Sequence, residues 1–466
     1  MTRSSDYSPT RIAVAPSPVP PGMGESRRTA WGLTGLLVLL TTINWGDKAV
    51  YGIIAVPLKA ELGLTSAQIG LVGSLFFVAY TIGGFCAGAL ARWMSLRWVL
   101  VVLALCWSAA MVPLAVAATF GVLVVSRMFL GLAEGPTAAL GLTATYSWHA
   151  PAKRALPSSL LAGSASIAKI AVAPVLTWVT VAHGWRAALL SLVVVGVLWC
   201  TVWLATWSQG PYISADRNGT RTARAGNGSG APDGVVAAEH EATVPWIRIF
   251  TTRTFLSCAL LTTCVYALVT VVLTWLPSYF QTGLGYSQLQ AGAMFAIPSL
   301  ASLPMMLVSS FMSDRLLARG ATARTVRIGI AAVGVIIGGI LLFAMPAIGA
   351  PALAVAAVSI GYGLTTPTAP LINSAISTIC PPRQTAGTLG VFLALMAVGG
   401  LVAPFATGAI VDAAAMPAEG YVLAFRILGV LCVVAAVVAL VFADPERDKA
   451  LLQREAAQTN GAGPSW

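Results

Sequence analysis

The sequence predicts an all-α integral membrane protein, with twelve transmembrane helices in two pseudo-symmetric bundles of six. Hydrophobic residues make up 57% and charged residues 9% of the 466 positions, whereas a soluble protein of this length carries about a quarter charged residues. The apolar residues fall into two groups of six long runs, each near the ~20 residues that a helix needs to cross a bilayer. A short motif recurs in both groups, which indicates duplicated halves.

The apolar runs set the order of the predicted helices. They occupy residues 31–57, 66–92, 97–118, 120–148, 155–182, 186–207, 254–281, 288–313, 325–346, 350–379, 386–412 and 420–443. The segment between the two groups is rich in Gly, Ala, Arg and acidic residues, which is typical of a flexible linker. We therefore divide the chain into an N-terminal tail (1–29), an N-terminal bundle (30–207), a linker (208–253), a C-terminal bundle (254–443) and a C-terminal tail (444–466).

The distribution of basic residues predicts the orientation. Most of the 27 Lys and Arg residues lie in the two tails, the linker and the loops on the same side of the predicted membrane. Cytoplasmic loops carry an excess of Lys and Arg. We therefore expect a multi-pass protein of the cell (inner) membrane, with both termini in the cytoplasm.

The two halves share a nine-residue motif. Residues 62–70 read LGLTSAQIG and residues 284–292 read LGYSQLQAG, and both stretches stand between the first and second helices of their half. Parallel duplicated halves are typical of transporters whose site lies at the interface between the halves, near the middle of the membrane.

Other short motifs carry a family resemblance. The loop after the second helix reads GALARWMSLR over residues 88–97, and a similar loop in the second half contains Asp314-Arg315. In the first-half loop, Ala91 stands at the position of that Asp. The helical motifs are Asn44-x-x-Asp47-Lys48, Arg127-x-x-x-Gly131-x-x-Glu134, Gly184-Trp185-Arg186 and Trp275-Leu-Pro-x-Tyr279. With the six-plus-six arrangement, they resemble the major facilitator superfamily, and in particular its anion:cation symporter branch. The resemblance implies the major facilitator fold and a gating motif, formed here by Arg92, Asp314 and Arg315.

Asp47 and Glu134 are the two acidic residues that fall deep within predicted helices. By helical rise, Asp47 lies ~15 Å and Arg127 ~10 Å below the outer ends of their helices. These depths are compatible with an Asp47–Arg127 ion pair. Glu134 follows Arg127 by seven residues and so shares its helix face, two turns further in.

This arrangement of charges predicts proton coupling. Burial favours the protonated form of an acid and a nearby cation favours the ionised form, so an acid whose cation leaves should take up a proton. The branch resemblance implies that Asp47 and Glu134 carry the proton, while Lys48 and Arg127 engage an anionic substrate. The family usually has Arg at position 48, and a lysine cannot form the bidentate fork to a carboxylate. The alternative is an ion-pair cluster that only fixes helix packing.

A third buried cation, Lys169, lies ~20 Å below the outer end of its predicted helix, too deep to reach the interface easily. Substrate contact, a local pair with Glu134 and a position in a wide aqueous vestibule are its three alternatives. If Lys169 faces the site, three cations oppose two acids, and this balance favours an anion. Trp45, Tyr80 and Asn373 are further candidate substrate contacts, although packing or interface anchoring also explains the aromatic rings.

The function predicted from these residues is proton-coupled uptake of a small organic carboxylate by alternating access. In the branch that the sequence resembles, members that carry sugar acids often have Asn in the eleventh helix, and the eleventh predicted helix here contains none. With Trp45, Tyr80 and Trp275 as candidate ring contacts, we favour an aromatic or short aliphatic carboxylate over a polyol acid. The alternative is a proton-driven exporter of acidic or amphipathic compounds on the same fold. The sequence shows no metal-ligand set, nucleophile–base pair or phosphate loop, so we expect no enzyme and no cofactor. The net charge of +11 accompanies no nucleic-acid-binding motif; the expected partners are the substrate anion, protons and the bilayer, with the protein a monomer.

Overall fold

The computed structural model describes residues 26–149, 155–208, 210, 244–345, 350–381 and 384–461, and every regular element in this part of the chain is helical. Eleven helical spans among these residues are long and apolar enough to cross a membrane. A twelfth long helix, α1 (Ser26–Leu62), carries Asp47 and Lys48 in its middle. The predicted all-α membrane fold is therefore confirmed. Residues 1–25 of the predicted N-terminal tail and most of the predicted linker lie outside the described residues.

The N-terminal bundle contains the first six spans. Its elements are α1, α2 (Ser66–Trp93), α3 (Leu96–Val116), α4 (Phe120–Glu134), α5 (Thr137–Tyr146), α6 (Ala155–Ile167), the π-helix η2 (Ala168–Val172), α7 (Ala173–His183) and α8 (Trp185–Thr206). The pairs α4–α5 and α6–α7 each make one span.

The C-terminal bundle follows the short helix α10 (Trp246–Phe250). Its elements are α11 (Arg253–Ser278), η3 (Tyr279–Gly283), α12 (Gln288–Met294), α13 (Ile297–Ala318), η4 (Arg324–Gly329), α14 (Ile330–Ala344), α15 (Pro351–Thr365), α16 (Thr368–Ile379), α17 (Thr385–Ala413) and α18 (Pro417–Phe442). A final helix, α19 (Pro445–Gly461), lies within the segment that the sequence assigned to the C-terminal tail.

The fourth and tenth spans are interrupted at corresponding places. Pro136 stands between α4 and α5, and Pro367 stands between α15 and α16. Proline has no N–H to continue the helical hydrogen bonds and crowds the preceding turn. The same device therefore divides the central helix of each half.

The repeated motif forms the same local structure in both halves. The side chains of Thr65 and Ser287 each accept a hydrogen bond from the backbone N–H three residues on. The side chains of Gln68 and Gln290 in turn accept a hydrogen bond from the backbone N–H of Thr65 and Ser287. The glycine two residues before each cap has a positive φ, 62° in the first half and 74° in the second. These positions therefore encode a tight turn followed by a capped helix start.

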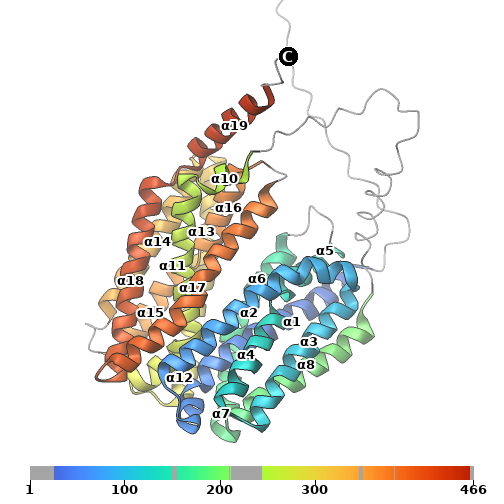
Figure 1. Ribbon diagram of the computed structural model, residues 1–466, viewed down its shortest axis with the longest axis vertical. Helices are drawn as coiled ribbons and strands as arrows, with labels where there is room; N and C mark the ends of the chain where they lie inside the picture. Colours follow the sequence, from blue (N-terminus) through green and yellow to red (C-terminus); the bar gives the residue numbers. More distant parts are fainter. Residues whose placement is uncertain are drawn as a thin grey trace, which may run out of the picture.

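The two bundles meet at the end of the molecule where α12 contacts α7, away from α10 and α19 (Figure 1). There Asp412 of α17 accepts hydrogen bonds from the first backbone amides of α2, from Ser66 at 2.8 Å and from Ala67 at 2.6 Å. A Cβ atom on Gly70 would overlap with the carbonyl oxygen of Pro404. Only a glycine permits this close approach of α2 to α17.

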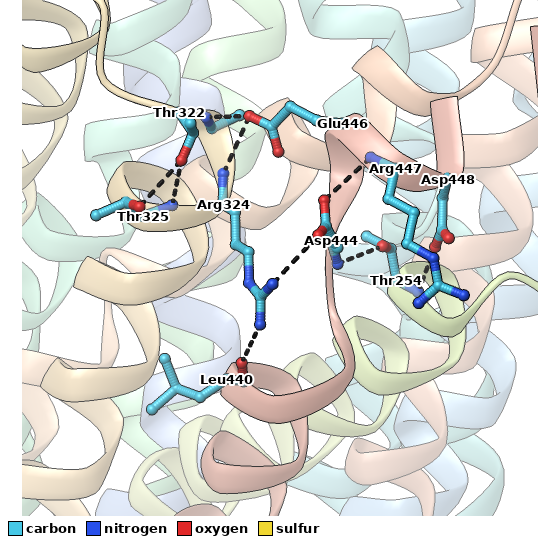
Figure 2. Close-up of polar contacts among 10 residues, drawn as sticks. Thr254, Thr322, Arg324, Thr325, Leu440, Asp444, Glu446, Arg447 and Asp448 are labelled. Carbon is cyan, nitrogen blue, oxygen red and sulfur yellow. Dashed lines mark hydrogen bonds and ion pairs between the residues drawn. The ribbon is translucent and has the colours of Figure 1, made fainter. Parts of the chain in front are cut away.

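At the opposite end, α19 is fixed to the C-terminal bundle by acidic side chains at helix starts (Figure 2). Asp448 accepts a hydrogen bond of 2.9 Å from the backbone N–H of Thr254, at the start of α11. Glu446 accepts from the backbone amides that precede and begin η4, and Asp444 pairs with Arg324 at 3.2 Å. Carboxylates at helix N-termini satisfy otherwise unpaired amides, so this segment is a docked helix.

Candidate functional site

A buried ion pair joins α1 to α4. The Nζ atom of Lys48 lies 2.6 Å from Oε2 of Glu134, and the two side chains are 4% and 0% exposed. Lys48 also donates to the side-chain oxygen of Asn44 at 2.6 Å and to the Asn44 carbonyl at 3.2 Å. Asn44 is placed for this because it lies one helical turn before Lys48. Three acceptors thus surround an ammonium group that has three N–H donors.

The carboxyl group of Asp47 is fully buried. Neither of its oxygens meets a hydrogen-bond donor among the described residues. Among the same residues, Oε1 of Glu134 is likewise buried without a hydrogen-bond partner.

The Asp47–Arg127 ion pair that the helix depths allowed does not form. Arg127 donates from Nη1 to the backbone carbonyl of Asp47, at 3.3 Å, and its Nε has no partner. The guanidinium carbon lies 4.2 Å from the ring centroid of Tyr51 and 4.8 Å from that of Phe76. The prediction is wrong because the carbonyl of Asp47, and not its carboxyl, faces the guanidinium.

Aromatic rings surround Lys48 on its remaining sides. Its Nζ lies 5.2 Å from the ring centroid of Trp45, 5.7 Å from Phe76 and 4.8 Å from Tyr80. Such rings attract a cation through their electron-rich faces. The structure therefore brings Trp45 and Tyr80, both predicted as substrate contacts, against the charged cluster.

The cluster reaches the interface with the C-terminal half. A small cavity of about 10 Å³, roughly the room for one water, adjoins both Lys48 and Arg127. Its other walls are Tyr51, Gly73, Phe76 and Phe77 of the first half and Leu273 and Thr274 of the second. The two cations therefore lie where the halves meet, and not against lipid.

Lys169 is buried and sits in the π-helix η2. It donates a hydrogen bond of 2.9 Å to the hydroxyl of Tyr362 on α15, in the other half, and lies 4.8 Å from that ring centroid. The structure thus shows neither the local pair with Glu134 nor an exposed vestibule position. Sequence reasoning missed Tyr362; a tyrosine between two glycines, Gly361 and Gly363, on a central helix was the available signal.

The structure does not bring the other predicted residues to the cluster. Asn373 lies on α16, where its side-chain oxygen is buried without a partner. Arg92, Asp314 and Arg315 are exposed near the ends of α2 and α13, and no ion pair links them in the described part of the chain. Within the same residues, no group of three or more His, Cys, Asp or Glu side chains is arranged to hold a metal.

Comparison with known families adds to this geometry. The family model described as the Major Facilitator Superfamily matches residues 37–403. A probable sulfoacetate transporter of Cupriavidus necator is 28% identical over 70% of this chain and 74% of its own length. A probable galactarate/D-glucarate transporter of Bacillus subtilis is 26% identical, over 64% and 67%. The D-galactonate transporter of Escherichia coli is 24% identical, over 86% and 94%.

Solved structures show the same fold at lower sequence identity. The crystal structure of a D-xylose–proton symporter superposes with a TM-score of 0.71, at 15% identity, over 90% of this chain and 99% of that one. A bacterial homologue of the human lysosomal transporter Spinster, in an inward-facing and unoccupied conformation, gives a TM-score of 0.70 at 18% identity, over 92% and 99%.

Proposed function

The chain belongs to the Major Facilitator Superfamily, and on that premise we propose that it takes up a small organic carboxylate with protons by alternating access. The observation that carries the proposal is the buried cluster of Asp47, Lys48, Arg127 and Glu134 at the interface of the halves. Buried ionisable residues in a membrane span are expensive and mark ion and substrate pathways. The named relatives, a probable sulfoacetate transporter, a probable galactarate/D-glucarate transporter and a D-galactonate transporter, support an anion as the cargo.

The coupling step follows from the contacts of Lys48. Its ammonium compensates the charge of Glu134 at 2.6 Å. When a carboxylate substrate enters beside Arg127 and draws Lys48 away, Glu134 loses its cation and takes up a proton, because burial disfavours an unpaired carboxylate. Asp47, which is buried without a donor of its own among the described residues, relays that proton. Release of the substrate restores the ion pair and expels the proton.

The orientation and the gates complete the proposal. We place the linker, both termini and the Arg92, Asp314 and Arg315 gating motif at the cytoplasmic side of the inner membrane. The contact of Asp412 with the start of α2 then closes the outer side. The exposed gating residues leave the cytoplasmic side unlatched, so this conformation faces inward. We propose that 30–207 and 254–443 rock as two bodies within a monomer.

Proteoliposomes test the coupling. A thermal-shift screen of the purified protein against acetate, succinate, benzoate and sulfoacetate first selects the probe. An inward proton gradient should then drive uptake of the labelled probe, and Glu134→Gln should abolish net uptake while sparing exchange. Gln retains an acceptor for Lys48 but cannot be ionised. The control is Glu419→Gln, which changes an exposed carboxylate on α18. Uptake that survives collapse of the gradient contradicts the proposal.

A further inference from the structure

Resting on the proposed function, we infer that the substrate is a short dianion whose two anionic groups bind Arg127 and Lys169. The buried charges of the site lead to this substrate class. Two acids and three cations are buried at or next to the interface of the halves, namely Asp47, Glu134, Lys48, Arg127 and Lys169.

The contacts divide these five groups unequally. Lys48 and Glu134 neutralise each other at 2.6 Å. Asp47 is fully buried and has no donor among the described residues, so its compatible state is the neutral, protonated acid. In the described part of the chain, no carboxylate lies within ion-pair distance of the remaining cations, Arg127 and Lys169.

The acceptors that these two cations do have are neutral. Arg127 donates to a backbone carbonyl, that of Asp47, at 3.3 Å. Lys169 donates to the hydroxyl of Tyr362 at 2.9 Å. Both side chains are buried, at 6% and 5% exposed. A neutral acceptor offsets only part of the cost of a buried charge. In the state that the substrate first meets, in which Lys48 is still paired with Glu134, a monoanion would leave one of the two positive charges uncompensated, whereas a dianion compensates both.

The two cations also lie at similar depth beside one helix. The contacts of α1 with Ser164 and Val172 bracket Lys169: the Thr41 and Ser164 hydroxyls are 2.7 Å apart, and a Cβ on Gly46 would lie 3.2 Å from Val172. Lys169 is thus level with the middle of α1, where Arg127 donates to the backbone carbonyl of Asp47. Both cations therefore approach the middle of α1.

Each cation touches the second half as well. Lys169 bonds Tyr362, and Arg127 lines the small cavity with Thr274. A ligand that bridges the two cations would therefore span the surface along which the halves separate. The tyrosine hydroxyl holds Lys169 in the empty site and gives way to the second anionic group.

The test compares ligands that differ by one charge. Affinities are measured by calorimetry for malonate, succinate, glutarate and sulfoacetate, and for succinamate, in which an amide replaces one carboxylate of succinate. We expect at least one dianion to bind at least about tenfold more tightly than its singly charged analogue, the effect of one hydrogen bond to a charged group. Lys169→Gln should reduce that ratio to below about threefold and leave the affinity for the monoanion unchanged. Tyr362→Phe should preserve the ratio, because the Lys169 ammonium remains.

The outcomes separate this inference from the proposed function. Equal binding of dianions and monoanions overturns the inference, as does a preference that survives Lys169→Gln, whereas proton-driven uptake of a monocarboxylate keeps the proposed function. Absence of binding or transport for every carboxylate overturns both. If Lys169→Gln does not fold, the ligand comparison on the unaltered protein and on Tyr362→Phe still decides the question.

Discussion

Replacing Asp412 by alanine is expected to open the end of the molecule where the two bundles meet. This carboxylate belongs to α17 of the second half but accepts its hydrogen bonds from Ser66 and Ala67, the first residues of α2 in the first half. Lys59 of α1 lies 3.9 Å away. Removal of the carboxylate leaves two amides at a helix start unpaired across the interface.

The size of the effect follows from these contacts. A hydrogen bond to a charged group contributes ~1.5–3 kcal/mol, and a negative charge at a helix N-terminus ~0.3–1 kcal/mol. The Asp412 side chain is 29% exposed, so water competes for these bonds, and the Lys59 pair adds little. We therefore expect Asp412→Ala to destabilise the closed state relative to the open state by ~2 kcal/mol, which raises the open population ~30-fold.

Cysteine accessibility measures this population. Thr274 is buried at the interface of the halves, next to Gly73. Thr274→Cys, in a background without the seven native cysteines, should react with an impermeant maleimide from this side ~30-fold faster when Asp412 is alanine. Glu61→Ala is the matched control, because within the described residues this carboxylate at the same end bonds only Trp185 and Arg186, of its own half. An unchanged labelling rate in Asp412→Ala would refute the reasoning.

Two further predictions concern the same end of the protein. Gly70→Ala should lower the thermal midpoint and speed the same labelling, because its Cβ would overlap with the Pro404 carbonyl, whereas Gly35→Ala, which meets nothing within 4 Å, should raise the midpoint slightly. The hydrogen bonds from Arg186 lower the pKa of Glu61. The stabilisation that the ionised Glu61 gives the folded protein is therefore complete above the usual pKa of Glu and fades as the pH falls below it. The difference in midpoint between the unaltered protein and Glu61→Gln should therefore shrink between about pH 7 and about pH 4, and a constant difference would contradict this.

The sequence was sufficient for the architecture and for the members of the cluster. Runs of apolar residues predict spans because a bilayer requires a fixed length of helix with its backbone groups paired internally. The repeated nine-residue motif indicated duplicated halves, and the structure gives both copies the same tight turn and capped helix start. Asp47, Lys48, Arg127 and Glu134 could be recognised because they are charged residues within apolar runs. Such residues are energetically unfavourable in a membrane span and are usually functional.

The partners within the cluster could not be predicted in the same way. Residues 47 and 48 differ by ~1.5 Å in depth but by ~100° in direction around the helix axis. An argument from depth therefore cannot decide whether Asp47 or Lys48 faces the fourth span. Tyr362 was missed for a related reason, because the alignment of one bundle against the other depends on how the halves pack. The docking of α19 depends on Asp444, Glu446 and Asp448 meeting helix starts that are distant in the sequence.

The lysine at position 48 acquires a role from its contacts. The ammonium has three donors, and Glu134, the Asn44 side chain and the Asn44 carbonyl occupy all of them. A substrate can therefore reach Lys48 only by displacing an existing acceptor, whereas Arg127 retains an unpartnered Nε. In the proposed function, Arg127 would then bind the anion first, and Lys48 would respond by releasing Glu134. Protonation of Glu134 would follow from substrate binding, which is the condition that the proposed symport requires.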